Sequence, residues 1–396
     1  MIPSFLSHAL FLVVVLVAFR YAWLRIRVVV PKRLRWFGGT AFIGIIFLAF
    51  AYRLLPEITG PQAQAMLGMG AFWMVFIGNW LVACLFMDLL FVILWIKARV
   101  WGFGLRSREI VFRLKLARDH WIPQALILTV LVTIGFCVYG WNKQLNFIVH
   151  YETLEIKKPA AEAIRIAVIS DAHFDPLFRA EKWDRLIDSL DRIQPDLIVL
   201  LGDMSDLSIH DLEAAGFADG IQKLHAPLGV FGITGNHEAY MMRRDPELLH
   251  WMQLQGMELL DESSVCMMGL CLTGRADPQM AKQNNEARKP LAKIQPDSIW
   301  ISRQAWIVLD HQPKGLEPSD LPASAPRPDL GLSGHTHGGQ FFPWTIVINW
   351  VWPLANGRGT LTGVPWITSS GFGQWGPALR VGSSTELLII DLVPKK

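Results

Sequence analysis

Residues 164–173 read IRIAVISDAH, an apolar run that ends in an aspartate and a histidine. A short run rich in Ile and Val and followed by polar residues is typical of a buried β-strand. Residues 182–193 carry apolar side chains at helical spacing, which predicts a helix after this strand. Further short apolar runs occur at residues 196–201, 229–234, 305–309 and 329–333. This order predicts an α/β domain, in which ligands gather at the carboxyl ends of the strands.

The same few polar residue types follow the predicted strands. The motifs are, in chain order, Asp171-Ala172-His173, Gly202-Asp203-Met204-Ser205-Asp206, Gly235-Asn236-His237-Glu238, Asp310-His311-Gln312-Pro313 and Gly334-His335-Thr336-His337-Gly338-Gly339. Imidazole nitrogen and carboxylate oxygen suit Mn, Fe or Zn, whereas the lack of cysteine in these motifs argues against a structural zinc finger. The sequence therefore predicts a metal site at the strand ends.

The last motif favours two ions over one. His335 and His337 are two residues apart with glycine on both sides, so their rings point apart and can serve neighbouring ions. A carboxylate such as Asp203 can bridge the pair. Two ions about 3.5–4 Å apart stabilise both the attacking and the leaving oxygen of a phosphoryl displacement. His237 is the candidate proton donor beside them.

The ordered set D-x-H, G-D-x-x-D, G-N-H-E, H and G-H-x-H resembles the calcineurin-like metallophosphoesterase family over residues 164–393. Residues 334–340, 370–373 and 379–380 are most similar to its membrane-associated bacterial branch. For residues 164–396, the resemblance implies a sandwich of two mixed sheets flanked by helices. It also implies two divalent metal ions (Mn, Fe or Zn) and a metal-dependent phosphoric ester hydrolase.

The family's residue roles carry over to matching positions. One metal would be held by Asp171, His173, Asp203 and His337, and the second by Asp203, Asn236, His311 and His335. His237 would protonate the leaving alkoxide or stabilise the transition state, Asp206 would orient ligands, and a metal-bound hydroxide would attack phosphorus. The implied substrate is a phosphodiester, phosphomonoester or pyrophosphate, including a lipid-linked one. An open alternative is a membrane-anchored scaffold or sensor that binds a phospho-ligand without turnover.

The first 150 residues differ sharply in composition from the rest of the chain. Four stretches without charge, or nearly so, predict transmembrane helices at residues 1–19, 36–52, 58–87 and 121–142. We therefore expect a four-helix membrane domain over residues 1–141, with the first helix retained rather than cleaved, and a connector over residues 142–163. The whole chain is 52% hydrophobic and 18% charged, which excludes a disordered protein.

Charge predicts the orientation of the chain. Residues 1–150 hold 15 Lys and Arg against 4 Asp and Glu, whereas the rest holds 22 against 30. The basic segments 20–35 and 97–118 belong in the cytoplasm by the positive-inside rule. We therefore expect the C-terminal domain on the periplasmic side of a bacterial inner membrane. We expect membrane lipids as partners. The acidic C-terminal domain makes nucleic acid an improbable one.

Three features leave alternatives open. Asp88 lies within a predicted span and is either functional or paired with a basic loop, the latter being favoured. Cys266 and Cys271 face each other if Met268-Gly269 forms a hairpin turn, so they are either a disulfide or two buried thiols. Residues 341–354 carry Trp344, Trp350 and Trp352 and form either core strands with a hairpin or an apolar wall facing the membrane or the acyl chains of a substrate.

Overall fold

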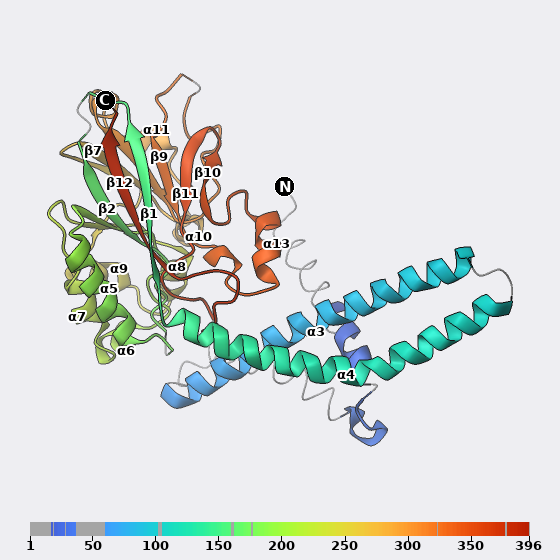
Figure 1. Cartoon of the computed structure of the whole chain (residues 1–396). Helices are drawn as coiled ribbons and strands as arrows, with labels where there is room; N and C mark the ends of the chain where they lie inside the picture. Colours follow the sequence, from blue (N-terminus) through green and yellow to red (C-terminus); the bar gives the residue numbers. More distant parts are fainter. Residues whose placement is uncertain are drawn as a thin grey trace. The chain divides into compact units, whose positions relative to one another are not determined.

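The computed structural model describes residues 17–18, 20–27, 29–36, 60–101, 105–159, 162–175, 177–322, 324–376 and 378–395. The chain divides into two compact units, Met1–Tyr139 and Gly140–Lys396. The larger unit is built on two six-stranded sheets, and the smaller unit contains two long helices (Figure 1).

The first sheet has the strand order β1-β12-β2-β3-β4-β5. Its strands are β1 Ile148–Ile156, β2 Ile164–Ile169, β3 Leu197–Leu200, β4 Val230–Gly232, β5 Glu258–Leu259 and β12 Glu386–Pro394. β12 pairs with β2 antiparallel, while β2, β3 and β4 run parallel. The sheet is therefore mixed, and its parallel strands are the ones that lead into predicted site motifs.

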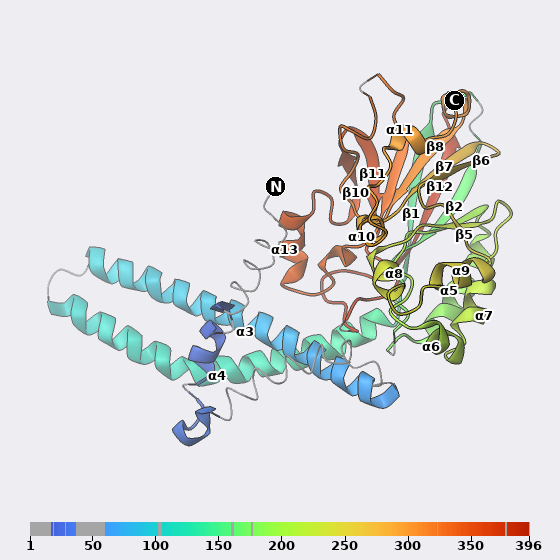
Figure 2. The ribbon, with the colours of Figure 1, turned by 180° about the vertical axis from the view of Figure 1, so that it is seen from behind.

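The second sheet has the strand order β10-β11-β9-β8-β7-β6. Figure 2 shows it in the view from the back of Figure 1. Its strands are β6 Ser263–Met267, β7 Leu270–Arg275, β8 Ala305–Asp310, β9 Leu330–Ser333, β10 Gly357–Leu361 and β11 Val364–Thr368. β7, β8 and β9 are parallel, whereas the outer pairs are antiparallel. The strands predicted at residues 164–170, 196–201, 229–234, 305–309 and 329–333 are thus confirmed.

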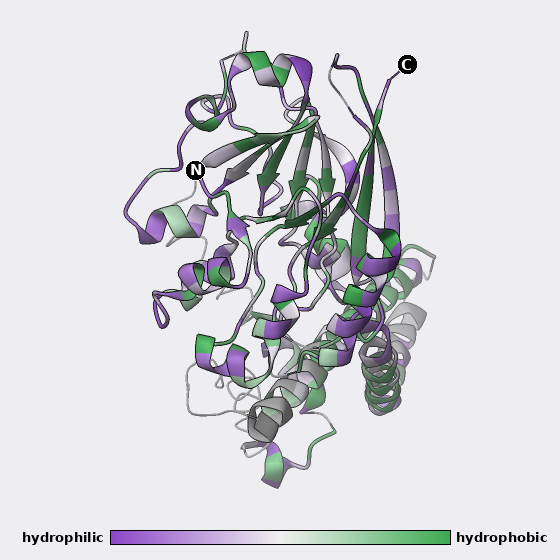
Figure 3. Cartoon of the chain, turned by 90° about the vertical axis from the view of Figure 1, so that its left-hand side faces the viewer, coloured by the Kyte–Doolittle hydropathy of each residue, from purple (hydrophilic) through white to green (hydrophobic). Residues whose placement is uncertain are grey.

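The core explains why the central strands are apolar at almost every position. Ile166 and Val168 of β2 pack with Leu272 and Ile307 of the second sheet, whereas Ala167 of β2 faces helices on the other side. A strand covered on both faces has no polar side to alternate with. Figure 3 shows the strands largely in the hydrophobic colour, while the flanking helices alternate between the two colours.

The described part of the larger unit also contains helices, several of which pack on the outer faces of the two sheets. They are α5 Ala180–Ile193, α6 Ile209–Ala214, α7 Phe217–Gln222, α8 Asn236–Met241, α9 Leu248–Leu254, α10 Pro278–Gln283, α11 Leu291–Ile294, α12 Ser298–Arg303 and α13 Trp344–Val351, with a 3-10 turn η2 at His337–Gly339. α5, α7 and α9 pack on the first sheet, and α11 and α12 pack on the second. The sandwich of two mixed sheets flanked by helices is confirmed.

The structure revises the start of this unit and excludes one open alternative. The predicted connector, residues 142–163, contains β1, which pairs in parallel with β12 at the edge of the first sheet. Its acidic residues, Glu152 and Glu155, belong to an exposed sheet edge, where charge discourages further strand pairing. Core strands and a hairpin in residues 341–354 are also contradicted, because α13 forms there and none of its residues is buried.

The smaller unit contains α3 Gly60–Trp101 and most of α4 Leu105–Gln144, whose last residues, from Gly140 on, belong to the larger unit. Within the described residues, two helical segments are long and apolar enough to cross a membrane, Gly68–Lys97 and His120–Gln144. They correspond to the third and fourth predicted spans. The predicted spans at residues 1–19 and 36–52 lie outside the described residues except at their ends, so the four-helix domain stays a prediction.

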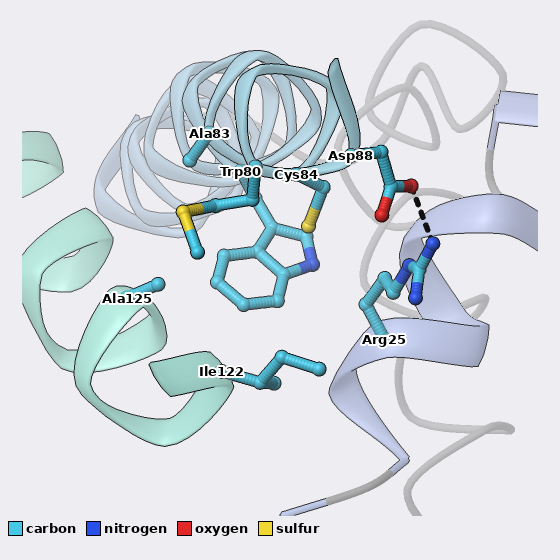
Figure 4. Close-up of a pocket in the computed structure, with 8 residues that line it drawn as sticks. Arg25, Trp80, Ala83, Cys84, Asp88, Ile122 and Ala125 are labelled. Atoms are coloured by element: carbon cyan, nitrogen blue, oxygen red, sulfur yellow. Dashed lines mark hydrogen bonds and ion pairs between the residues drawn. The ribbon is translucent and has the colours of Figure 1, made fainter. Parts of the chain in front are cut away.

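Asp88 on α3 has basic and phenolic partners. Arg25 and Tyr21, from the helical residues 20–26, both bond to its carboxylate. Figure 4 shows the Arg25–Asp88 pair at the rim of a small pocket lined by Trp80, Cys84, Ile122 and Ala125. The pairing interpretation of Asp88 is supported, with a partner in the basic segment 20–35.

A disulfide joins Cys266 of β6 to Cys271 of β7, which are directly opposite each other in the antiparallel pair. Met268 and Gly269 form the turn between them, as the disulfide hypothesis required. Such a bond persists in an oxidising compartment.

We expect that alkylation of denatured, non-reduced protein will leave Cys266 and Cys271 unmodified, because both sulfurs are engaged in the bond. Peptide mass spectrometry before and after reduction measures this. Labelling of Cys84 or Cys137 under the same conditions is the internal control. Labelling of both Cys266 and Cys271 without reductant would contradict the disulfide.

Candidate metal centre

The predicted site residues meet where parallel strands of both sheets end. Asp171 and His173 follow β2, Asp203 and Asp206 follow β3, Asn236 and His237 begin α8 after β4, His311 follows β8, and His335 and His337 follow β9. Except for the partly buried Asp206 and His335, each of these residues is less than one tenth exposed. Tight turns after five strands thus bring together side chains up to 166 positions apart in the sequence.

Asp171, His173 and His337 form one group of potential ligands. The Nε2 atoms of His173 and His337 are 3.1 Å apart, and His337 Nε2 is 3.5 Å from Asp171 Oδ1. Asp203 Oδ2 lies 3.8 Å from His173 Nε2. Lone pairs of two imidazoles and two carboxylates therefore converge on one point.

Asp203, His311 and His335 form a second group. His311 Nε2 lies 3.0 Å from Asp203 Oδ2 and 3.2 Å from His335 Nδ1. The side-chain oxygen of Asn236 is buried, and it accepts no hydrogen bond from the described part of the chain. Asp203 belongs to both groups, which is the arrangement expected of a bridging carboxylate.

The electrostatics of these groups suit a bound cation. Burial lowers the pKa of His335 to about 3, and burial together with Arg380 holds the pKa of His337 well below its usual range. Both rings are therefore neutral at physiological pH and keep a lone pair for a metal. Burial also raises the pKa of Asp171, so a nearby positive charge is needed to keep this carboxyl ionised. The donor set thus fits divalent ions.

Hydrogen bonds fix which ring nitrogen of His311 faces the site. Its Nδ1 donates to the backbone oxygen of Leu201 at 2.6 Å, so Nε2 is the nitrogen that faces Asp203 and that could bind an ion once it has lost its proton. Burial alone would raise the pKa of Asp203, but the imidazoles of His311 and His237 hold it well below its usual range. Asp203 is consequently a carboxylate.

The backbone at the site is strained. Asp171, His173, Asp203, His335 and His337 all have φ between 43° and 71°, in the left-handed region that residues other than glycine seldom adopt. Such residues cost about 1–3 kcal/mol each and persist only where the surroundings over-determine them. Gly235 and Gly334 allow the close approach, because a Cβ on either would collide with Asp203 or Asp171. The sharp turns aim five ligands inward.

His237 and Asp206 form a pair beside the two ligand groups. Nδ1 of His237 bonds to Asp206 Oδ1, and the backbone N–H of His237 donates to Asp203 Oδ1 at 2.7 Å. Distance alone would also allow His237 to share an ion with His173 and Asp203. The bond to Asp206 instead gives His237 the pairing of a proton-transferring imidazole.

Two positioning residues were not identified from the sequence. The Glu238 carboxylate accepts the backbone N–H groups of Asp203, Met204 and Gly235 at 2.7–2.8 Å, which ties the turns after β3 and β4 together. Its position three residues after Gly235, at the start of a helix, was the available signal. Arg380 is fully buried and donates to the backbone oxygen of His337 at 2.8 Å. Nothing local in the sequence predicts this second contact.

The comparisons with known proteins agree with this geometry. A family model described as calcineurin-like phosphoesterase matches residues 164–339. An uncharacterized metallophosphoesterase of Campylobacter jejuni is 28% identical over 273 residues, covering 68% of this chain and 70% of the relative. An uncharacterized metallophosphoesterase of Helicobacter pylori is 28% identical over 59% of this chain and 60% of its own length.

A relative from Danio rerio is named a transmembrane protein with metallophosphoesterase domain. It is 28% identical over 281 residues, which cover 67% of this chain and 62% of that protein. The chain thus spans less than two thirds of the Helicobacter and Danio relatives.

We expect the two ligand groups to lose metal separately. Purified protein loaded with Mn or Zn should retain about two ions per chain, His311→Ala and His337→Ala about one each, and Asp203→Ala fewer than one, because Asp203 serves both groups. Metal analysis after desalting measures this, with the exposed His210→Ala as the matched control. Unchanged metal content in Asp203→Ala would refute the shared-ligand assignment.

Proposed function

Because this chain carries a calcineurin-like phosphoesterase domain, we propose that it hydrolyses a phosphoester by metal-dependent catalysis at the centre formed by Asp203 and its neighbours. The observation that carries the proposal is the convergence of two ligand groups on one shared carboxylate. We assign Asp171, His173, Asp203 and His337 to one divalent ion and Asp203, Asn236, His311 and His335 to another. Manganese, iron and zinc all suit this set of donors.

The bound ions would polarise the phosphoryl oxygens and make water a better nucleophile at neutral pH. The chain's own contribution to proton transfer is His237. With Nδ1 bonded to Asp206, proton transfer to a substrate oxygen would use Nε2, on the opposite side of the ring. Burial alone would raise the pKa of Asp206, but His237 and His173 hold it well below its usual range, so Asp206 is a carboxylate that orients the ring.

The candidate substrates are a phosphodiester, a phosphomonoester and a pyrophosphate, and we include lipid-linked forms of each. Support for an amphiphilic substrate comes from residues 341–357, which carry no charge and follow directly on the last metal-ligating turn. The competing hypothesis is a scaffold or sensor that binds a phospho-ligand without cleaving it. Hydrolysis itself distinguishes the two.

We further propose that the domain is anchored in a membrane by α3 and α4 and lies outside the cytoplasm. Residues 97–118 contain seven Lys and Arg and connect the two candidate spans, so the positive-inside rule holds this connection in the cytoplasm. The Cys266–Cys271 disulfide is consistent with an oxidising compartment.

We expect His237→Ala to lower turnover of a chromogenic phosphodiester or monoester by about 10²–10⁴-fold while metal content stays unchanged, since general acid catalysis contributes that much. Asp203→Asn should lose both turnover and metal. The assay uses detergent-purified protein that is stripped of metal and then given Mn, Zn, Fe or Mg, with His210→Ala as the control. Tight metal binding without hydrolysis of any ester would favour the scaffold.

We expect the C-terminal domain to be accessible from the periplasm when the full chain is expressed in a Gram-negative bacterium. External protease should remove a C-terminal tag in cells whose outer membrane has been opened, and leave a tag placed between residues 101 and 105 intact until the inner membrane is lysed. The reverse pattern would overturn the orientation.

A further inference from the structure

α13 is an apolar helix without a cover in the described structure. Its sequence WTIVINWV contains only Thr and Asn as polar residues, and none of its eight residues is buried. Trp350 is 80% exposed and Trp344 46% exposed, with Ile346 and Val351 also exposed. We call these four side chains the α13 surface. A helix that is apolar all round is ordinarily buried in a core or in lipid, so this surface needs an occupant.

The connection between a candidate membrane span and α13 indicates the occupant. The span His120–Gln144 ends in the unit that holds the metal centre, and there Arg380 N–H donates to Gly140 O at 3.2 Å. The next residue, Val381, accepts a hydrogen bond from Phe342 N–H at 2.9 Å. Phe342 is two residues before α13. One short path of hydrogen bonds within the larger unit therefore places the start of α13 near Gly140, close to the end of the candidate span.

The other end of α13 borders the metal centre. Trp352, which follows the helix, makes an edge contact with the ring of the candidate ligand His335 at 5.0 Å between centroids. The ammonium group of Lys314 lies over the Trp352 ring at 5.8 Å. An apolar surface with a tryptophan and a lysine at its edge has the composition of a protein surface at lipid headgroups, where indole prefers the interface and ammonium attracts phosphate.

We propose that the α13 surface inserts into the headgroup region of the bilayer that holds the spans, and that the substrate is a phosphoester of a lipid in that same bilayer. The substrate class rests on the proposed hydrolase function, whereas the insertion does not. Insertion by about 5–10 Å is usual for an interfacial helix. It would bring His335 and its neighbours to the level of the lipid phosphates, and Lys314 would pair with one of them.

A crosslinking experiment tests insertion without relying on turnover. The full chain is reconstituted in nanodiscs of phosphatidylethanolamine and phosphatidylglycerol with Trp350→p-benzoylphenylalanine. The matched control is Leu254→p-benzoylphenylalanine, at a 66% exposed position of α9. Illumination should give lipid adducts at position 350 and only background at position 254, as measured by peptide mass spectrometry. Adducts to a second copy or another segment of the chain, or background at both positions, would overturn the proposal.

A kinetic experiment tests the substrate class. The double variant Ile346→Ser with Trp350→Ser should lower kcat/KM for a phosphodiester lipid in vesicles by about 10–100-fold. This is the loss expected when two apolar side chains that leave water on insertion are removed. Turnover of a soluble chromogenic diester should change by less than about twofold, because neither side chain is placed among the ligands. Equal losses on both substrates would contradict lipid specificity.

The two experiments separate the failure of one proposal from that of the other. Lipid adducts at position 350 in a protein that hydrolyses no ester would reject the hydrolase and keep the membrane-docking surface. Hydrolysis of the soluble diester without lipid adducts at position 350 would keep the hydrolase and reject the membrane-docking surface.

Discussion

The site depends on one buried carboxylate, Asp203, that is shared between the two sheets. It comes from the first sheet, and its oxygen Oδ2 lies 3.0 Å from Nε2 of His311, which comes from the second. A buried carboxylate is stable only when opposite charge and hydrogen-bond donors surround it. Glu238 holds the turn that carries Asp203, and His237 N–H donates to the carboxylate. Asp203 therefore joins the two sheets at the site, and the turn that carries it is fixed by its neighbours.

The sequence was sufficient to predict the α/β order and the polar motifs that the structure brings together, because each motif directly follows an apolar strand; the sandwich of two sheets was implied by the family resemblance. It was not sufficient where long-range partners decide the outcome. β1 has the composition of a polar connector and becomes a strand because β12, more than 200 residues later, offers an edge. Residues 341–354 are apolar enough for core strands, but α13 forms and stays exposed. Arg380 has its role only because the chain returns to His337.

Arg380 links the end of α4 to the turn that carries the candidate ligand His337. Arg380 donates through its backbone N–H to Gly140, in the last turns of α4, and through its guanidinium to the backbone oxygen of His337. Its side chain is fully buried, so this connection is packed on all sides. The end of α4 and the turn of the candidate ligand His337 are therefore held together by one residue within the larger unit.

The left-handed backbone at Asp171, His173, Asp203, His335 and His337 has a consequence for the engineering of this protein. Glycine would relieve the strain at each of these positions and would destroy a ligand in doing so. Selection for heat resistance alone would therefore favour substitutions that empty the centre. A library screened for thermal tolerance should be screened for metal retention in the same round, because at these positions the residue that favours stability lacks the side chain that could bind metal.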